Sequence, residues 1–122
     1  WDAPEVPEED RWATRQVDAL VAAMDGDGRA LILCGDFNVT PDDPVLSRLA
    51  RAGFRDAHRD LARGPTCCAN GRTQVMDYLC HGPGLVAAPG EVADLRGVTS
   101  LPSHAHPSDH LPVLARFEPR PG

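Results

Sequence analysis

Apolar residues along the chain form one amphipathic stripe and then several short, dense runs. Between Glu8 and Met24 they recur at helical spacing, after Pro7 and with acidic side chains in the first turn, which predicts an amphipathic helix. The stripe consists of Ala13, Val17, Leu20, Val21 and Met24. The apolar run from Ala30 to Cys34 is typical of a buried β-strand.

The rest of the chain predicts a second helix and further strands. Asp43 is a suitable N-cap, Pro44 suits the first helical position, and Gly53 is expected to end this helix. Its inward-facing residues are expected to be Val45, Leu46 and Leu49. The predicted strands are Val75 to Cys80, a segment within Leu85 to Leu95, and Leu111 to Phe117; the predicted loops are Ala62 to Gly71 and Ser100 to Pro107; Phe54 to Leu61 is ambiguous. Helices that alternate with apolar strands predict a layered α/β architecture.

Polar residues suited to catalysis stand next to two of the predicted strands. Asp36 and Asn38 follow the run that ends at Cys34, and Asp109 and His110 directly precede the last strand. Ligands of α/β sheets bind beyond the carboxyl ends of strands, and carboxylates beside a histidine suit metal-assisted hydrolysis. The structural alternative is that Asp36, Asn38 and Asp109 form turns and that His110 is a surface histidine.

Composition narrows the function less than the motifs do. The chain has 122 residues, enough for one domain or part of one, and a net charge of −6. With this negative balance, no broad basic face is expected to attract a phosphate backbone, although nucleic acid is not excluded. The 12 basic residues are all arginines. No run is long and apolar enough to be read as a transmembrane segment, no signal peptide is visible, and the compartment is left open.

The cysteines show no spacing typical of a zinc site. Cys34 and Cys80 each follow an apolar run, so we expect both to be buried as small hydrophobic residues. A disulfide from Cys67 or Cys68 to a distant cysteine is the alternative, because these two neighbours are poor partners for one another.

Three short motifs occur in an order that resembles a known family. They are Gly35-Asp36-Phe37-Asn38 with Thr40-Pro41, then Asp77-Tyr78, then Ser108-Asp109-His110-Leu111-Pro112-Val113. Together they resemble the C-terminal half of the endonuclease/exonuclease/phosphatase family, also called deoxyribonuclease-I-like. The resemblance implies an α/β fold, the C-terminal part of a two-sheet α/β sandwich whose N-terminal half is missing. We therefore expect a partial domain with residues 1–10 as a loop leader, 11–118 as the C-terminal half and 119–122 as a tail.

The resemblance also implies an activity and a role for each motif residue. Such a protein hydrolyses a phosphodiester or phosphomonoester by in-line attack of water, with Mg²⁺ or Mn²⁺ as cofactor. Asp36 would orient or deprotonate the water, Asn38 would bind a phosphate oxygen, and Asp109 would hold the metal or its waters. His110 would donate to a non-bridging phosphate oxygen, braced by Asp77. A carboxylate partner of this kind should raise the pKa of His110 and keep the ring cationic.

Two departures from the family pattern bear on these expectations. The principal metal-binding Glu comes from the N-terminal half of the family domain, and none of Glu5, Glu8 and Glu9 can be assigned to it. Many members also carry Arg two positions before the Asp-Tyr aspartate, where this chain has Val75. We therefore expect the chain alone to be inactive and to need the missing N-terminal half as its partner.

Alternative functions follow from the same departures. The chain could be an inactive or truncated module of this fold that acts through partner binding, since half a sandwich exposes apolar sheet surface. A weaker alternative is a zinc hydrolase in which His104, His106 and Asp109 bind the metal. The substrate is left open among nucleic acid, phospholipid and small phosphoesters.

Overall fold

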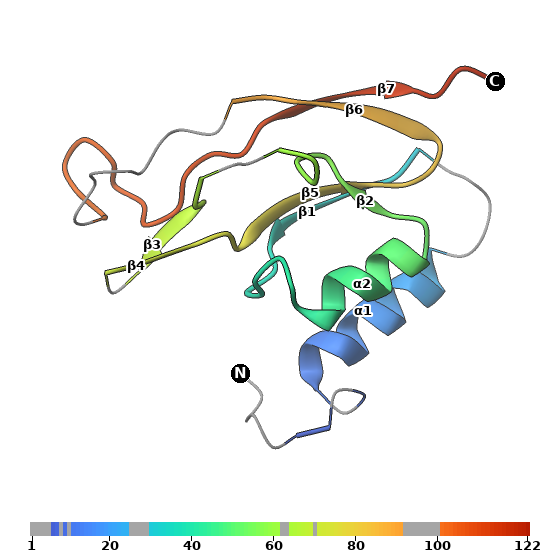
Figure 1. Cartoon of the computed structure of the whole chain (residues 1–122), viewed down its shortest axis with the longest axis horizontal. Coiled ribbons are helices and arrows are strands. Elements are labelled where there is room, and N and C mark those ends of the chain that lie inside the picture. The colour runs from blue at the N-terminus through green and yellow to red at the C-terminus, as the bar shows by residue number, and fades with distance from the viewer. Residues whose placement is uncertain are drawn as a thin grey trace.

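The chain forms an α/β structure, as the sequence predicts. The computed structural model describes residues 6–7, 9, 11–24, 30–61, 64–69, 71–91 and 101–122. Within these ranges a pair of helices lies on one side of a central sheet, and a two-stranded sheet lies on the other side (Figure 1). No helix among the described residues has the length and apolar character needed to cross a membrane.

The two helices of the described residues pack against each other through two ion pairs. Helix α1 spans Trp12–Ala23 and helix α2 spans Pro44–Arg51. The Arg48 guanidinium lies 3.1 Å from Asp18, and the Arg11 guanidinium lies 3.3 Å from Asp43. The expected helix start, Glu8, lies outside the described residues. Glu9 and Arg11 are described but do not belong to α1, which begins at Trp12, so the predicted helix is wrong at these two positions.

Helix α2 begins and ends where its sequence predicts. The Asp43 carboxylate accepts a hydrogen bond from the Val45 N–H at 2.9 Å, which satisfies one of the free donors of the first turn. Pro44 occupies the first turn, where its missing N–H costs nothing. Gly53 follows the helix with a φ of +92°, a conformation that residues with a Cβ rarely adopt.

The central sheet is antiparallel and contains β1 (Ile32–Asp36), β5 (Asp77–His81) and β2 (Arg55–Asp56), with β5 in the middle. The strand predicted from Ala30 to Cys34 is therefore shifted, so that Asp36 is the last strand residue. The register pairs Asp36 with Asp77, the first residue of β5. The end of one strand thus lies beside the start of the other, and two carboxylates from distant parts of the sequence become neighbours.

A short hairpin of two strands occurs at the end of the predicted loop and directly after it. Strands β3 (Cys67–Ala69) and β4 (Arg72–Gln74) pair as a hairpin, so the loop prediction for Ala62 to Gly71 is wrong over β3. Gly71 has a φ of +74°, which allows the tight reversal between the strands. Each strand has only three residues, and those of β4 are all polar, so the pair lacks the long apolar signal on which the prediction relied.

A further pair of strands forms the layer opposite the helices. Strand β6 (Leu85–Pro89) pairs with β7 (Ala115–Pro119), which is drawn in red in Figure 1. The last strand thus begins four residues later than predicted, because the backbone at Leu111 pairs with Thr66 instead. The predicted strand within Leu85 to Leu95 is found only as far as Pro89, and Val92 to Leu95 lie outside the described residues.

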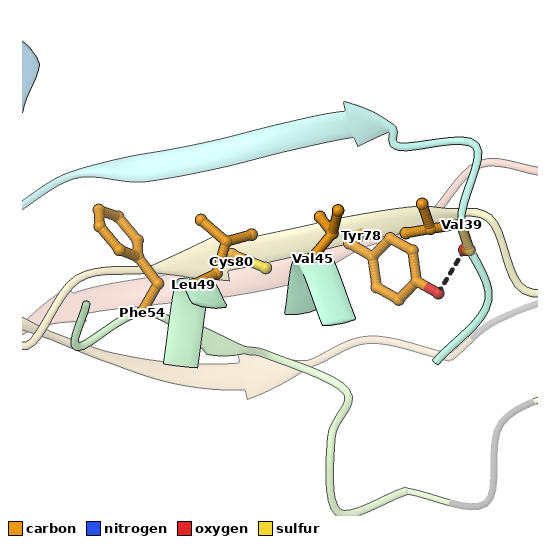
Figure 2. Packing of buried hydrophobic residues seen from close by; sticks show 6 residues of the cluster. All are labelled: Val39, Val45, Leu49, Phe54, Tyr78 and Cys80. Carbon is orange, nitrogen blue, oxygen red and sulfur yellow. Dashed lines mark hydrogen bonds between the residues drawn. The ribbon is translucent and has the colours of Figure 1, made fainter. Parts of the chain in front are cut away.

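The core lies between the helices and the central sheet. Figure 2 shows its fully buried residues, which are Val39, Val45, Leu49, Phe54, Tyr78 and Cys80. The predicted inward face of α2 is confirmed at Val45 and Leu49, while Leu46 is half-buried and packs against the same cluster. This core fixes one face of β5, the strand that carries Asp77.

The cysteines follow the sheet geometry rather than their local apolar runs. All four are free thiols, so the alternative of a disulfide from Cys67 or Cys68 is wrong. Cys80 is buried as expected, but Cys34 is exposed. Successive side chains of a strand point to opposite faces, and Leu33 packs against the helix-side core, so Cys34 points away from it.

Candidate active site

The end of β1 is shaped so that the Asp36 carboxylate is held in place. Gly35 has a φ of +145°, which a residue with a Cβ rarely adopts, and Asn38 has a φ of +53°, which asparagine tolerates well. The Asn38 backbone N–H donates to Asp36 Oδ1 at 2.8 Å. This short contact fixes one carboxylate oxygen and leaves Oδ2 facing His110.

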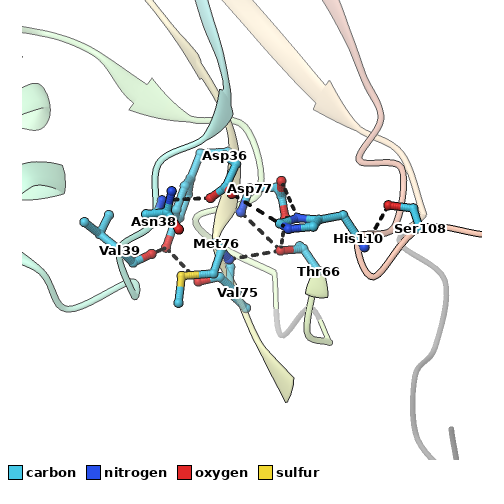
Figure 3. A network of polar contacts seen from close by, with 10 residues as sticks. Asp36, Asn38, Val39, Thr66, Val75, Met76, Asp77, Ser108 and His110 are labelled. Atoms are coloured by element: carbon cyan, nitrogen blue, oxygen red, sulfur yellow. Dashed lines mark hydrogen bonds and ion pairs between the residues drawn. The ribbon is translucent and has the colours of Figure 1, made fainter. Parts of the chain in front are cut away.

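His110 lies between two carboxylates (Figure 3). Its Nδ1 lies 2.9 Å from Asp77 Oδ2 and 3.1 Å from Asp77 Oδ1, while its Nε2 lies 3.8 Å from Asp36 Oδ2. With the Nδ1 proton donated to Asp77, Nε2 faces the side on which Asp36 lies. The expectation that Asp77 contacts the His110 ring is met by this geometry.

The surroundings of His110 favour its charged form. The hydrogen bond to Asp77 is the main cause that raises the pKa of His110 above its usual value of about 6.5, and the charges of Asp77, Asp36 and Asp109 act in the same direction. Partial burial opposes them. The predicted rise of the His110 pKa is therefore confirmed, and the ring keeps its proton to a higher pH than a histidine without these neighbours.

A threonine that the sequence analysis did not single out completes this arrangement. The Thr66 hydroxyl donates to Asp77 Oδ2 at 2.6 Å and accepts hydrogen bonds from the backbone N–H groups of Met76 and Asp77 at 3.0 and 3.1 Å. Thr66 is completely buried. It lies in the segment predicted as a loop, where nothing in the local pattern distinguishes it from an ordinary polar residue.

The His110 segment is tied to the start of β3 by its backbone. The Cys68 N–H donates to the Asp109 carbonyl at 2.8 Å, and the Leu111 N–H donates to the Thr66 carbonyl at 2.7 Å. The Ser108 hydroxyl accepts from the His110 N–H at 3.0 Å. Backbone hydrogen bonds to the unpredicted hairpin and to Thr66 directly before it therefore hold the segment that carries Asp109 and His110 in position.

Negative charge gathers where these segments meet. Burial raises the pKa of the Cys67 thiol, and the carboxylates of Asp77, Asp36 and Asp109 raise it further. The structure therefore brings together the side chains of Asp36, Asp77 and His110, while Asp109 is held beside Cys68 through its backbone carbonyl. The exposed Asn38 reaches this site through its backbone N–H. An excess of carboxylates around one cationic ring is an environment that attracts a divalent cation.

The described residues do not form a complete metal site by themselves. Among the described residues no group of three or more His, Cys, Asp and Glu side chains could hold a metal ion. The zinc alternative, which requires His104, His106 and Asp109 together, thus gains no support from the described part of the chain. Mg²⁺ prefers oxygen ligands and retains waters, so one or two protein carboxylates can hold it, and the metal-binding role of Asp109 stays a prediction.

Comparison with known proteins finds a family match that includes the segments of Asp36, Asp77 and His110. The model of the Endonuclease/Exonuclease/phosphatase family matches residues 1–110. Carbon catabolite repressor protein 4 homolog 4 of Arabidopsis thaliana is 32% identical over 114 residues, covering 75% of this chain and 27% of the relative. The CCR4-Not complex 3'-5'-exoribonuclease subunit Ccr4 of Coccidioides immitis is 28% identical over 119 residues, covering 71% of this chain and 16% of the relative. The chain thus spans about a quarter or less of the length of these relatives.

Proposed function

This chain belongs to the endonuclease/exonuclease/phosphatase family, and we propose that it carries part of the active site of a divalent-metal-dependent phosphoesterase. The observation that supports the proposal most directly is the position of His110, which bonds Asp77 at 2.9 Å and has its Nε2 3.8 Å from Asp36. One cationic ring between two carboxylates provides a donor for an anionic substrate and a base for water at the same place.

His110 is proposed to bind the phosphate oxygen on which negative charge builds. With Nδ1 bonded to Asp77, the protonated ring offers its Nε2–H to a non-bridging oxygen. A donor that is already oriented stabilises the developing charge without reorganisation in the transition state. Asp77 acts through His110 and does not itself touch the substrate.

Asp36 and Asn38 are proposed to act on the water and the phosphate. Asp36 Oδ1 is occupied by the Asn38 N–H, so Oδ2 is the oxygen available to orient or deprotonate an attacking water. The exposed Asn38 side chain would donate its amide N–H to a phosphate oxygen. These roles need both residues at the end of β1, where the backbone places them.

Asp109 is proposed to hold Mg²⁺ or Mn²⁺, directly or through its waters. The bound cation would neutralise phosphate charge and polarise the phosphorus–oxygen bonds. The charge of Asp109 acts on both His110 and Cys67, which supports a place for this carboxylate at the edge of the site. The remaining ligands would come from waters, from the phosphate and from residues outside those described.

RNA is the substrate that we propose within this activity. The similar protein of Coccidioides immitis carries the name of a 3'-5'-exoribonuclease subunit of the CCR4-Not complex. The net charge of −6 argues against a broad electrostatic attraction to nucleic acid, so affinity would come from contacts at the scissile end of the strand. A 5'-labelled single-stranded RNA oligonucleotide should shorten from its 3' end, while the DNA oligonucleotide of the same sequence is cut more slowly.

Hydrolysis of bis(p-nitrophenyl) phosphate tests the activity independently of substrate recognition. We expect turnover with Mg²⁺ or Mn²⁺, and none with EDTA, from a longer polypeptide that contains this chain, and no turnover from the chain alone. Asp36→Ala and His110→Ala should each lower kcat by about 10²–10³-fold, whereas His106→Ala, at an exposed loop position, should not.

Three results would contradict the proposal. Unchanged hydrolysis in Asp36→Ala or His110→Ala would remove the assigned roles, and absence of turnover in every form would favour an inactive partner-binding module. Stoichiometric zinc that survives dialysis, together with loss of activity in His106→Ala, would favour the zinc alternative.

A further inference from the structure

We propose that Thr66 is a positioning residue of this site, whose hydroxyl holds the Asp77 carboxylate in the orientation that braces His110. The inference deepens the proposed phosphoesterase function and rests on it for its catalytic consequence. Its structural part, the fixed direction of the Thr66 hydroxyl, stands on the contacts of Thr66 alone.

The direction of the Thr66 hydroxyl proton is determined by its neighbours. A hydroxyl group has one proton to donate and two lone pairs that accept. The backbone N–H groups of Met76 and Asp77 occupy the accepting side, at 3.0 and 3.1 Å. The proton is left to Asp77 Oδ2 at 2.6 Å, a distance typical of a strong hydrogen bond to a charged acceptor.

Burial makes this hydrogen bond persistent. Thr66 has no exposed surface, so water does not compete for its hydroxyl. Asp77 Oδ2 therefore receives one bond from Thr66 at 2.6 Å and one from His110 Nδ1 at 2.9 Å, as Figure 3 shows. With one oxygen held in this way, the carboxylate plane cannot rotate freely and both of its oxygens remain within reach of the imidazole.

The backbone of Thr66 joins the two segments that carry the pair. Its N–H donates to the Gln74 carbonyl at 2.9 Å, in the segment that leads into β5, and its carbonyl accepts from the Leu111 N–H at 2.7 Å, directly after His110. One residue thus sets the distance between the strand of Asp77 and the segment of His110. A buried apolar residue at this position would keep these backbone bonds but lose the hydroxyl contact.

Matched variants separate the hydroxyl from the bulk of the side chain. Thr66→Val keeps the shape and removes the hydroxyl, whereas Thr66→Ser keeps the hydroxyl and removes the methyl group. We expect Thr66→Val to lower kcat on bis(p-nitrophenyl) phosphate by about tenfold with little change in KM, as loss of an orienting partner does, and Thr66→Ser to retain kcat. Equal kcat in Thr66→Val and wild type, or failure of Thr66→Ser to retain it, would overturn the proposal.

A double-mutant cycle shows whether Thr66 acts through Asp77. In an Asp77→Asn background, Thr66→Val should lower kcat by much less than in the wild type, because the carboxylate that it orients is already gone. Equal effects in both backgrounds would mean that Thr66 supports the fold in general, and would contradict a positioning role.

A spectroscopic measurement tests the placement without relying on activity or on a variant that folds. The Thr66 hydroxyl proton of the wild-type protein should exchange slowly enough to be observed by NMR, with a nuclear Overhauser contact to the Met76 and Asp77 amide protons. A hydroxyl proton in fast exchange with water would overturn the proposal. A slow proton in a protein that hydrolyses no phosphoester would instead reject the proposed function and leave the placement standing.

Discussion

The charge of His110 depends on a single neighbour more than on any other group. The Asp77 hydrogen bond is the largest cause of its raised pKa, ahead of the charges of Asp36 and Asp109. An imidazole that must donate to phosphate works only while protonated, so its pKa sets the upper limit of the working pH range.

We therefore predict a pH profile that falls on the alkaline side. Because the folded-state pKa of His110 is raised, log kcat/KM should be level at pH values below that raised pKa and decline as the pH passes through it. Asp77→Asn removes the main cause of the shift, so the decline should move to lower pH. A profile unchanged by Asp77→Asn would show that another group controls the alkaline limb.

The raised pKa of His110 also makes the free energy of unfolding depend on pH, in a direction that can be predicted. A histidine whose pKa is raised on folding stabilises the folded state most below its unfolded value of about 6.5, and this contribution disappears as the pH rises through the folded value. The free energy of unfolding should thus fall over that window in the wild type, and fall less in His110→Ala. Urea unfolding at a series of pH values measures both.

Single residues also mark where sequence reasoning succeeds and where it ends. The pairing of Asp77 with His110 could be inferred, because a motif resemblance assigned a role to each. Thr66 could not, because its importance lies in contacts with residues 8 to 45 positions away in the sequence, and no local pattern encodes them.

Among the helices and strands, α2 is the element whose sequence determines its bounds most directly. Asp43→Ala should lower the free energy of unfolding by about 1 kcal/mol through loss of the N-cap bond to Val45. Loss of the partly buried contact with Arg11 at 3.3 Å adds up to about 1 kcal/mol. Chemical denaturation measures the change, and kcat per folded molecule should stay the same.

The neighbouring Asp42 provides the matched control for this prediction. It is exposed and its carboxylate accepts from the Thr40 hydroxyl rather than from a helix N–H. Asp42→Ala should therefore destabilise the protein less than Asp43→Ala does. Equal effects of the two substitutions would argue against capping as the source of the stability.

Strands were less predictable than helices for a physical reason. The caps of α2 are local signals, whereas a strand is completed by a partner elsewhere in the chain. Cys67–Ala69 pairs with Arg72–Gln74 and also contacts the His110 segment, although neither stretch shows alternating apolar residues. Cys34 is exposed for the same reason, because the sheet register and not the apolar run decides which face a residue occupies.

On the scale of the whole molecule, the site exists because three separated segments meet at one end of the central sheet. The sequence identified Asp36, Asp77 and His110 as candidates, and the α/β class followed from the alternation of elements. The antiparallel register that sets Asp36 opposite Asp77 could be known only from the folded structure, because no sequence pattern specifies it. The layer of helices stabilises this arrangement from below through the core that includes Tyr78.

Tyr78 connects that core to the site, and this connection gives a prediction for the whole molecule. Its buried hydroxyl donates to the Val39 carbonyl at 2.8 Å and lies 3.2 Å from the Val75 carbonyl, so it contacts the segments that follow Asn38 and precede Asp77. Tyr78→Phe should lower the free energy of unfolding by about 1 kcal/mol, the usual contribution of one hydrogen bond. It should also lower kcat, because both segments lose a shared anchor.

Phe54→Leu separates these two effects. Phe54 is buried in the same core but has no polar contact with the site segments, so Phe54→Leu should reduce stability through lost packing and leave kcat unchanged. Thermal or urea unfolding and hydrolysis of bis(p-nitrophenyl) phosphate, measured on both variants, make the comparison. If both variants lower kcat equally at matched loss of stability, the site responds to the stability of the whole fold. If only Tyr78→Phe lowers it, the site depends on this one hydroxyl to keep β1 and β5 aligned where Asp36 and Asp77 face His110.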